Sequence, residues 1–234
     1  MHSAGGVTLG VLVNLPMFRQ VPRAQLAELV RGAQVVHARR GEPVARSGEP
    51  PPGLMAVGYG LVKLSLSEGG GKVLRLVGAG ETFGEAMLFL EQPLPVDATA
   101  LCDTLVVVLP RAPLLALLER DPRFARALLA SLCQRLHELV ADFQSATAYG
   151  ARERLAAYLE ALVEPGARAA ELPAPKAVVA ARLGVAKETL SRLLRQFSAE
   201  GLISVAGRRI TLLDRERLAA ARQGIKPAAG CQPA

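Results

Sequence analysis

One face of the segment 187–200 carries side chains that can read the edges of DNA bases. Glu188 and Arg192 recur at helical spacing on this face, and Ser191 lies beside them. An arginine can make paired hydrogen bonds to guanine O6 and N7, and a glutamate can accept from cytosine N4. Arg195, one turn further on, is better placed for phosphate. The side chains expected to contact DNA from this segment are Lys187, Glu188, Thr189, Ser191, Arg192 and Arg195.

The opposite face of the same segment is apolar and must pack on a neighbouring element. It carries residues at i, i+3, i+4 and i+7, namely Leu190, Leu193, Leu194 and Phe197. A short helix is expected over 176–183, and Gly184 supplies the left-handed residue that ends it. A helix, a glycine turn and a second helix with a polar outer face make a helix-turn-helix, whose second helix enters the major groove of DNA.

Two short strands are expected after this helix. The segments 202–205 and 209–212 are strand-like, and a tight turn at 206–208 joins them. Such a hairpin would form a wing, with Arg208 and Arg209 on the phosphate backbone, where contacts add affinity but little sequence preference. On spacing alone, an ordinary helical hairpin with a solvated charged face is the alternative.

The distribution of charge also favours a polyanionic partner for this region. The net charge of the chain is +7. From Gly150 onward there are 14 Lys and Arg against 8 Asp and Glu, so +6 of the charge lies in the last third. A basic module on a nearly neutral body is typical of nucleic-acid binding.

A β-rich domain is predicted before this module. The segment 35–109 alternates short apolar runs with Gly, Pro and acidic turns. Strand-like runs such as 61–66, 73–77 and 105–109 at this spacing predict an antiparallel barrel or jelly roll.

A long helix is expected to follow the barrel. Asp121 is a favourable N-cap, and Pro122 suits the first helical position. Apolar residues then recur at steps of three and four, the pattern of a heptad seam, which favours a partner helix over packing on the barrel alone. A further helix over 151–163 and an irregular link over 164–175 lead to the basic module. The expected dimer interface is Leu129, Leu132, Leu136, Leu139 and Phe143.

Composition excludes several classes of protein. Half of the residues are apolar (50%), which excludes a disordered chain. No apolar run reaches the roughly 20 residues that span a membrane, so a cytoplasmic protein without a membrane partner is expected. The three histidines are spread along the chain, which argues against a metalloenzyme and a Ser-His-Asp hydrolase. Three widely spaced cysteines are neither a disulfide framework nor a zinc pattern, and Cys102 and Cys133 are expected as core thiols.

The chain resembles the Crp/Fnr family of regulators. The run 187–194, followed by Gly201-Leu202-Ile203, looks like the recognition helix and wing of that family. Its cyclic-nucleotide-binding β-roll is matched by Gly41-Glu42, Ser47-Gly48-Glu49, Gly60-Leu61-Val62-Lys63 and the run 80–86.

The resemblance implies a homodimer on a palindromic double-stranded DNA site, with the two recognition helices about 34 Å apart in successive major grooves. Glu188, Ser191 and Arg192 match the trio of the Fnr-type branch, which suggests half-sites like TTGAT rather than TGTGA. An unknown small effector and RNA polymerase are the further partners expected of such a regulator.

The departures from the family concern the effector. Cyclic-AMP binders of the family carry an Arg-Ser pair in the phosphate cassette, whereas the matching region here is Pro95-Val96-Asp97-Ala98. Cyclic AMP is therefore not expected. Gly84 and Glu85 of the cassette are retained, so the predicted effector pocket is Gly84, Glu85, Val96 and Asp97.

The positions of cysteine and histidine bear on two other sensors of the family, an iron–sulfur cluster and haem. No cysteine precedes Cys102, so an N-terminal iron–sulfur cluster is not expected. The run 85–89 and the tail 214–218 resemble the regulators of denitrification that respond to nitric oxide, thought to act through haem. Haem would need an axial ligand, for which His37 and His137 are the candidates, and no other metal site is predicted.

The sequence thus predicts an α+β protein that is a transcription regulator and not an enzyme. Residues 1–120 form an antiparallel β-roll, a jelly roll like cyclic-nucleotide-binding domains, 121–148 the dimerisation helix and 149–234 a winged helix-turn-helix. An effector in the roll would change the packing of the dimer helices. One alternative is a constitutive DNA-binding protein with a non-sensing roll. Another is a cupin-like enzyme with a DNA-binding domain, which would need a metal cluster in a barrel that contains only His37.

Overall fold

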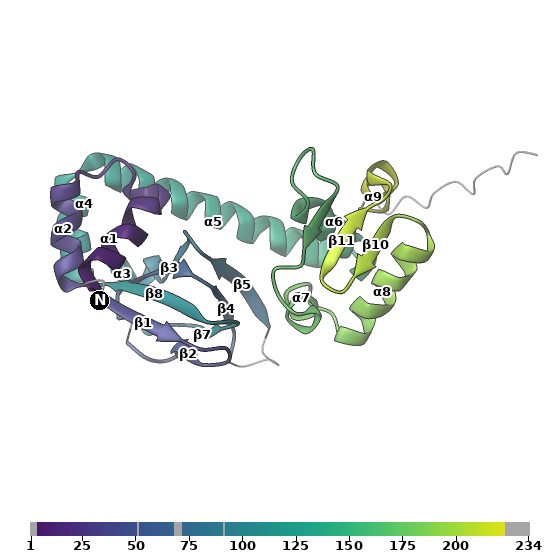
Figure 1. Cartoon of the computed structure of the whole chain (residues 1–234), viewed down its shortest axis with the longest axis horizontal. Helices are drawn as coiled ribbons and strands as arrows, with labels where there is room; N and C mark the ends of the chain where they lie inside the picture. The colour runs from purple at the N-terminus through teal and green to yellow at the C-terminus, as the bar shows by residue number, and fades with distance from the viewer. Residues whose placement is uncertain (1–3, 51, 68–71, 91, 223–234) are drawn as a thin grey trace, which may run out of the picture. The chain divides into compact units, whose positions relative to one another are not determined.

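The computed structural model describes residues 4–50, 52–67, 72–90 and 92–222, without the side chains of 141–148. The chain folds as two compact units, Met1–His137 and Glu138–Ala234 (Figure 1). The two units meet within one long helix, α5 (Pro122–Ala148), so the three-part division expected from the sequence stays a prediction. In the ranges described, no helix has the length and hydropathy needed to cross a bilayer.

Eight short strands of the first unit form two antiparallel sheets, which confirms the predicted β-roll. One sheet has the order β1-β8-β3-β6 and the other the order β2-β7-β4-β5. The strands are β1 (Gln34–Ala38), β2 (Pro43–Ala45), β3 (Leu54–Tyr59), β4 (Leu61–Ser65), β5 (Val73–Gly78), β6 (Thr82–Phe83), β7 (Asp97–Ala100) and β8 (Thr104–Leu109).

Alternation along the strands separates the inside of the roll from its outside. In β7, Ala98 and Ala100 are buried, whereas Asp97 and Thr99 are half-buried on the opposite face. The inward residues join an apolar cluster from both sheets, which includes Val57, Val62, Phe83 and Val106. Because side chains alternate with a period of two, polar residues of β7 face away from this core.

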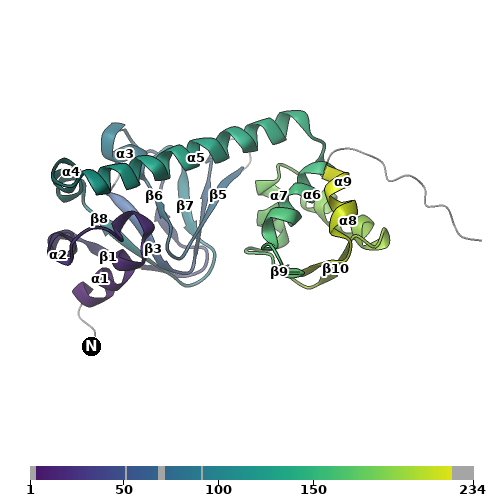
Figure 2. The same ribbon diagram turned by 90° about the horizontal axis from the view of Figure 1, so that it is seen from above.

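Helices cover the outer face of the sheet that contains β3 and β8. A second apolar cluster joins them to the sheet, and within it the rings of Phe18 and Phe124 stack with centroids 5.2 Å apart. Figure 2 shows these helices beside β1 and β3. They are α1 (Ala4–Asn14), the 3-10 turn η1 (Pro16–Phe18), α2 (Arg23–Gly32) and α4 (Arg111–Arg120); the short α3 (Glu85–Leu90) follows β6.

The long helix α5 begins as its sequence predicts. Pro122 is its first residue, and Asp121 Oδ1 accepts the backbone N–H of Arg123 at 2.9 Å. The guanidinium of Arg123 also donates to both carboxylate oxygens, and these bonds hold the pKa of Asp121 at about 2. The cap is therefore charged throughout the neutral range, where it complements the helix N-terminus.

Over its described residues, up to 222, the second unit is a winged helix-turn-helix of four helices and a three-stranded sheet in the order β10-β11-β9. The predicted irregular link over 164–175 is wrong in part, because it contains β9, which pairs with β11. The wing turn is also one residue tighter than expected, since Ala206 pairs directly with Arg209. The elements are α6 (Ala151–Leu162), β9 (Ala169–Glu171), α7 (Lys176–Arg182), α8 (Lys187–Ala199), β10 (Ile203–Ala206), β11 (Arg209–Leu212) and α9 (Arg215–Arg222).

Candidate functional site

Helix α8 has the two faces that its sequence predicts. Its apolar side chains are buried in the second unit, with Phe197 fully enclosed and Leu193 8% exposed. On the other face, Thr189 and Ser191 are half-buried, and four longer side chains are exposed: Lys187, Glu188, Arg192 and Arg195. The structure therefore brings the six predicted DNA-contacting residues of this helix to one surface.

The exposed side chains of α8 are available for a ligand. Within the described part of the chain, Lys187, Glu188 and Arg192 have no hydrogen-bonded or ion-paired partner. Arg195 makes only a long bond, 3.4 Å, from Nε to the carbonyl oxygen of Ser191. A guanidinium that is not committed elsewhere can present its paired donors to a guanine.

The turn before α8 leaves the start of that helix open. Gly184 has φ +66° and ends α7, a conformation that favours glycine. The N-cap of α8 is Ala186, whose side chain cannot accept from the first amide groups of the helix. Uncapped amides and the helix dipole together favour a phosphate at this position.

The far end of α8 is anchored by contacts that no local sequence pattern reveals. Arg152 on α6 pairs with Glu200 through bonds of 3.0 and 2.5 Å, and its guanidinium lies 4.6 Å from the centroid of the Phe197 ring. The hydrogen bond from Arg152 is the main cause that lowers the pKa of Glu200. Arg152 and Glu200 are 48 residues apart, so only the folded chain shows that they position the recognition helix.

The two arginines of the predicted wing have different roles. Arg208 donates from Nε and Nη2 to the carbonyl oxygen of Leu172, at 3.0 and 2.5 Å, and so ties the wing to the segment before α7. Arg209 is exposed and has no partner among the described residues. The free guanidinium of the wing is therefore that of Arg209.

In the roll, Gly84 and Glu85 lie where the long helix α5 packs. Gly84 has φ +87°, and Glu85 is 3% exposed at the start of α3. The carboxylate of Glu85 pairs with the guanidinium of Arg135, which also donates to the carbonyl and hydroxyl oxygens of Thr82 at 2.7 and 2.9 Å. Glu85 Oε1 is buried without a partner among the described residues. Sequence reasoning missed Arg135, which lies 50 residues away from Glu85.

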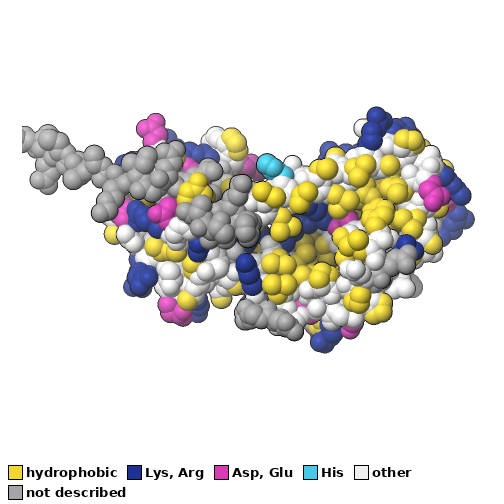
Figure 3. Space-filling view, turned by 180° about the vertical axis from the view of Figure 1, so that it is seen from behind, with side chains coloured by type: hydrophobic (Ala, Val, Ile, Leu, Met, Phe, Trp, Pro, Cys, Tyr) yellow, Lys and Arg dark blue, Asp and Glu magenta, His cyan; other side chains and the backbone are white. Residues whose placement is uncertain are grey.

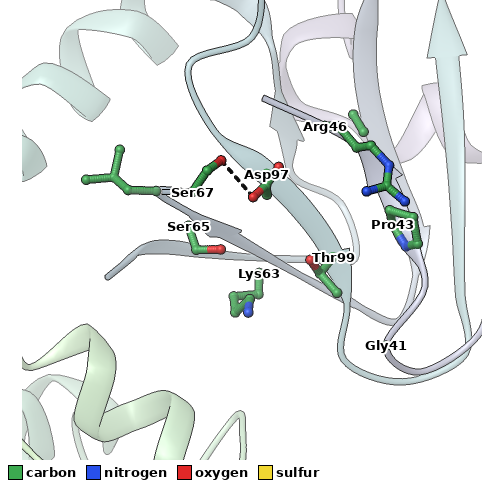
Figure 4. A pocket seen from close by; sticks show the side chains of 10 residues that line it. Gly41, Pro43, Arg46, Lys63, Ser65, Ser67, Asp97 and Thr99 are labelled. Atoms are coloured by element: carbon green, nitrogen blue, oxygen red, sulfur yellow. Dashed lines mark hydrogen bonds between the residues drawn. The ribbon is translucent and has the colours of Figure 1, made fainter. Parts of the chain in front are cut away.

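The structure does not bring all four predicted pocket residues together. Val96 packs on the apolar cluster inside the roll. Asp97 instead lines a hollow on the outer face of β2, β7 and β4, and Gly84, Glu85 and Val96 are not among the residues lining it (Figure 4). The period of two along β7 explains the difference, because Asp97 and Ala98 face opposite sides of the sheet.

The two candidate haem ligands both lie at the surface of the chain. His37 on β1 and His137 on α5 are both exposed. Among the described residues, no group of three or more His, Cys, Asp or Glu side chains could hold a metal ion. The expectation that Cys102 and Cys133 are core thiols is wrong, because both are exposed.

Among the side chains that the structure describes, an apolar row of helix α5 has no partner. Phe124 and Leu128 are buried in their own unit, and Leu132 packs partly on the same cluster. By contrast, Leu129 is 60% exposed and Leu136 is 65% exposed. The exposed row also contains Cys133, Leu139 and Val140, whereas the side chain of Phe143 lies outside the described residues. Figure 3 shows hydrophobic side chains gathered on one face of the first unit.

These features define a DNA-binding protein with an attached β-roll, and comparisons with known proteins agree. A model of the cyclic nucleotide-binding domain matches residues 35–121, and a model of the Crp-like helix-turn-helix domain matches residues 153–221. The cyclic AMP receptor protein of Thermus thermophilus is 34% identical over 172 residues, which are 70% of this chain and 76% of that protein. The transcriptional regulator SdrP of the same organism is 31% identical over 190 residues, 77% of this chain and 90% of that protein.

A solved structure agrees with the fold of both units. FixK2 from Bradyrhizobium japonicum matches with a TM-score of 0.71 and 26% identity, over 85% of this chain and 99% of that chain. The chain belongs to the Crp/Fnr family of transcription regulators. The alternative of a cupin-like enzyme is therefore wrong, because the relatives are DNA-binding regulators and not enzymes.

Replacing the two wing arginines separately should distinguish their roles. Arg209→Ala should weaken binding to specific and random DNA alike, because a phosphate contact does not read sequence. The salt slope of log K should fall by about 1 for this variant. Arg208→Ala should instead lower the melting temperature, because it removes two hydrogen bonds to Leu172. Fluorescence anisotropy over a salt series and thermal unfolding measure both effects; a loss on specific DNA alone would contradict the role of Arg209.

Proposed function

We propose that the protein is a homodimeric regulator that binds palindromic DNA, with its effector sensed in the β-roll and the signal carried by α5. The observation that carries the proposal is the pair of uncommitted surfaces: the polar stripe of α8 and the apolar row of α5. Neither surface is covered by other described residues of the isolated chain. DNA suits the first, and a second copy suits the second.

The proposed dimer buries the exposed row of α5 against its counterpart. Leu129, Cys133, Leu136 and Val140 follow one another at steps of four, three and four, the spacing of a seam between two helices. Burial of one leucine side chain stabilises a fold or interface by about 1.5–3 kcal/mol. A two-fold axis along this row would place two recognition helices on one side of DNA, one helical turn apart.

The proposed half-sites are TTGAT-like, as in the Fnr-type branch of the family. Support comes from the exposed Glu188 and Arg192 and the half-buried Ser191, the trio in which the chain resembles that branch. Arg192 would read the guanine, and the open N-terminus of α8 would hold a phosphate. A dimer of this kind would act in the cytoplasm, together with RNA polymerase.

The proposed route from effector to DNA passes through the pair of Glu85 and Arg135. Glu85 begins α3, and Arg135 immediately precedes Leu136 of the exposed row. An effector that competes for either charge would therefore shift α5 and with it the seam. DNA affinity would follow the population of the correctly spaced dimer.

We propose a small organic effector other than cyclic AMP, in spite of the cyclic AMP receptor among the relatives. The residues after α3 that the structure describes, 92–97, contain no arginine that could neutralise a cyclic phosphate. Arg135 is already bonded to Glu85 and Thr82. The exposed positions of His37 and His137 also argue against haem.

Arg192→Ala should cost roughly 1–3 kcal/mol of specific binding and relax the preference at one guanine position. The reason is the loss of two hydrogen bonds to a base edge. Competition binding over single-base variants of the TTGAT palindrome measures the effect. Arg195→Ala is the matched control and should weaken all sites equally. Equal losses for Arg192→Ala on specific and random DNA would rule out base reading by this residue.

Leu136→Lys should convert the dimer to monomers and abolish binding to the palindrome. The charge would otherwise be buried against the partner helix without compensation. Sedimentation and anisotropy measure the two losses. Leu213→Lys is the control, because Leu213 is 58% exposed but lies outside α5. A Leu136→Lys protein that remains dimeric at micromolar concentration would refute the proposed seam.

Cyclic AMP and haemin should both leave the protein unchanged. Anisotropy with palindromic DNA should give the same affinity with and without cyclic AMP. The absorption spectrum with added haemin, in air and under nitric oxide, should show no stoichiometric Soret band. A Soret band that shifts with nitric oxide and is lost in His37→Ala or His137→Ala would instead identify a haem sensor. Tighter DNA binding with cyclic AMP would identify a cyclic AMP receptor.

A further inference from the structure

The outer face of the roll contains a polar hollow that the proposed function does not use. We define the outer hollow by six side chains that line it: Arg46, Lys63, Ser65, Ser67, Asp97 and Thr99. Its volume is about 400 Å³, within the usual range of small-molecule sites. Figure 4 shows these side chains around the open centre of the hollow.

The sheet register places the hollow's residues side by side. Lys63 on β4 lies opposite Thr99 on β7, and Ser65 lies opposite Asp97. On the other edge of β7, Thr99 lies opposite Pro43 of β2. Neighbouring residues on one face of a sheet are close enough to contact one ligand together. Four of the six side chains thus lie on paired strands, whereas Arg46 follows β2 and Ser67 follows β4.

Asp97 is fixed and charged. Its Oδ1 accepts the backbone N–H of Ser47 at 2.9 Å, and its Oδ2 accepts the hydroxyl of Ser67 at 2.8 Å. These two bonds, followed by the charges of Arg46 and Lys63, lower the pKa of Asp97. Each carboxylate oxygen still has a lone pair, so Asp97 can accept further hydrogen bonds from ligand hydroxyls.

The two cationic side chains of the hollow have hydrogen-bond donors that are available to a ligand. No residue that the structure describes accepts a hydrogen bond from the side chain of Arg46 or Lys63, and the hydroxyls of Ser65 and Thr99 likewise have no such partner. With Asp97 as the one acid among the lining side chains, the hollow has a net charge of +1. A monoanion would neutralise it, whereas a dianion would be repelled by Asp97.

We propose that the outer hollow binds a small polyhydroxylated monocarboxylate, a sugar acid. The ligand carboxylate pairs with Lys63 and Arg46, which supply charged donors. The ligand hydroxyls donate to Asp97 and accept from Ser65 and Thr99. This site lies on the opposite face of the sheet from the apolar core of the roll, and its lining residues include neither member of the pair of Glu85 and Arg135 nor any residue of α8.

Thermal unfolding of the full chain with potassium gluconate tests the site. Gluconate should raise the melting temperature with a saturable dependence, because a ligand that binds only the folded state stabilises it. Glucose, which lacks the charge, and acetate at equal ionic strength, which lacks the hydroxyls, should not give a saturable shift. Glucose 6-phosphate should bind at least threefold more weakly than gluconate, because its dianion meets Asp97.

Two variants and a control localise the effect. Lys63→Gln and Arg46→Gln should each weaken gluconate binding at least fivefold, because each removes a charged donor. Lys72→Gln makes the same change of charge at an exposed lysine outside the hollow and should leave binding unchanged. The proposal is overturned by an equal response to acetate, by gluconate binding that survives Lys63→Gln, or by tighter binding of glucose 6-phosphate. DNA affinity, measured separately, should remain normal in both variants.

Discussion

Helix α5 has two apolar faces: one packs on the first unit, and the other is exposed. The rest of the structure depends on how the apolar residues are divided between these faces. Phe124 and Leu128 pack on the first unit, and Arg135 bonds to Glu85 and Thr82 on the same side. The exposed row begins only one residue after Leu128. Both sides belong to one continuous helix. The proposed sensing and the proposed assembly would therefore share one set of backbone atoms.

Several arginines of the second unit stabilise its fold through hydrogen bonds, in addition to contributing positive charge. Arg154 donates to the carbonyl oxygen of Leu183, and Arg215 donates to that of Val163. Arg208 likewise donates to the carbonyl oxygen of Leu172, and Arg152 pairs with the carboxylate of Glu200. The net positive charge of this unit is therefore larger than the charge available to contact DNA, because several guanidinium groups are hydrogen-bonded within the fold. Among the described residues, the guanidinium groups without a hydrogen-bonded or ion-paired partner include those of Arg192 on α8, Arg209 in the wing and Arg168 before β9.

How much could be predicted from the sequence depended on the range of the interactions. Helix α8 and the wing are encoded by local spacing, so Phe197 and Arg192 fall on the expected faces. The strand β9 was missed because its residues, Ala-Ala-Glu, are not typical of a strand and form one by pairing with β11. The pair of Glu85 with Arg135 and the pair of Arg152 with Glu200 join residues that are 50 and 48 positions apart, which spacing does not encode.

The open start of α8 has a consequence for the timing of recognition. Ala186 leaves the first amide groups of the helix without a side-chain acceptor, so this turn is the part of α8 most ready to fray in the free protein. A phosphate would complete it. Glu188, which lies in that turn and could accept from cytosine N4, would then become ordered as the backbone contact forms. Indiscriminate contact with the DNA backbone would thus precede the reading of its bases, as a search along DNA requires.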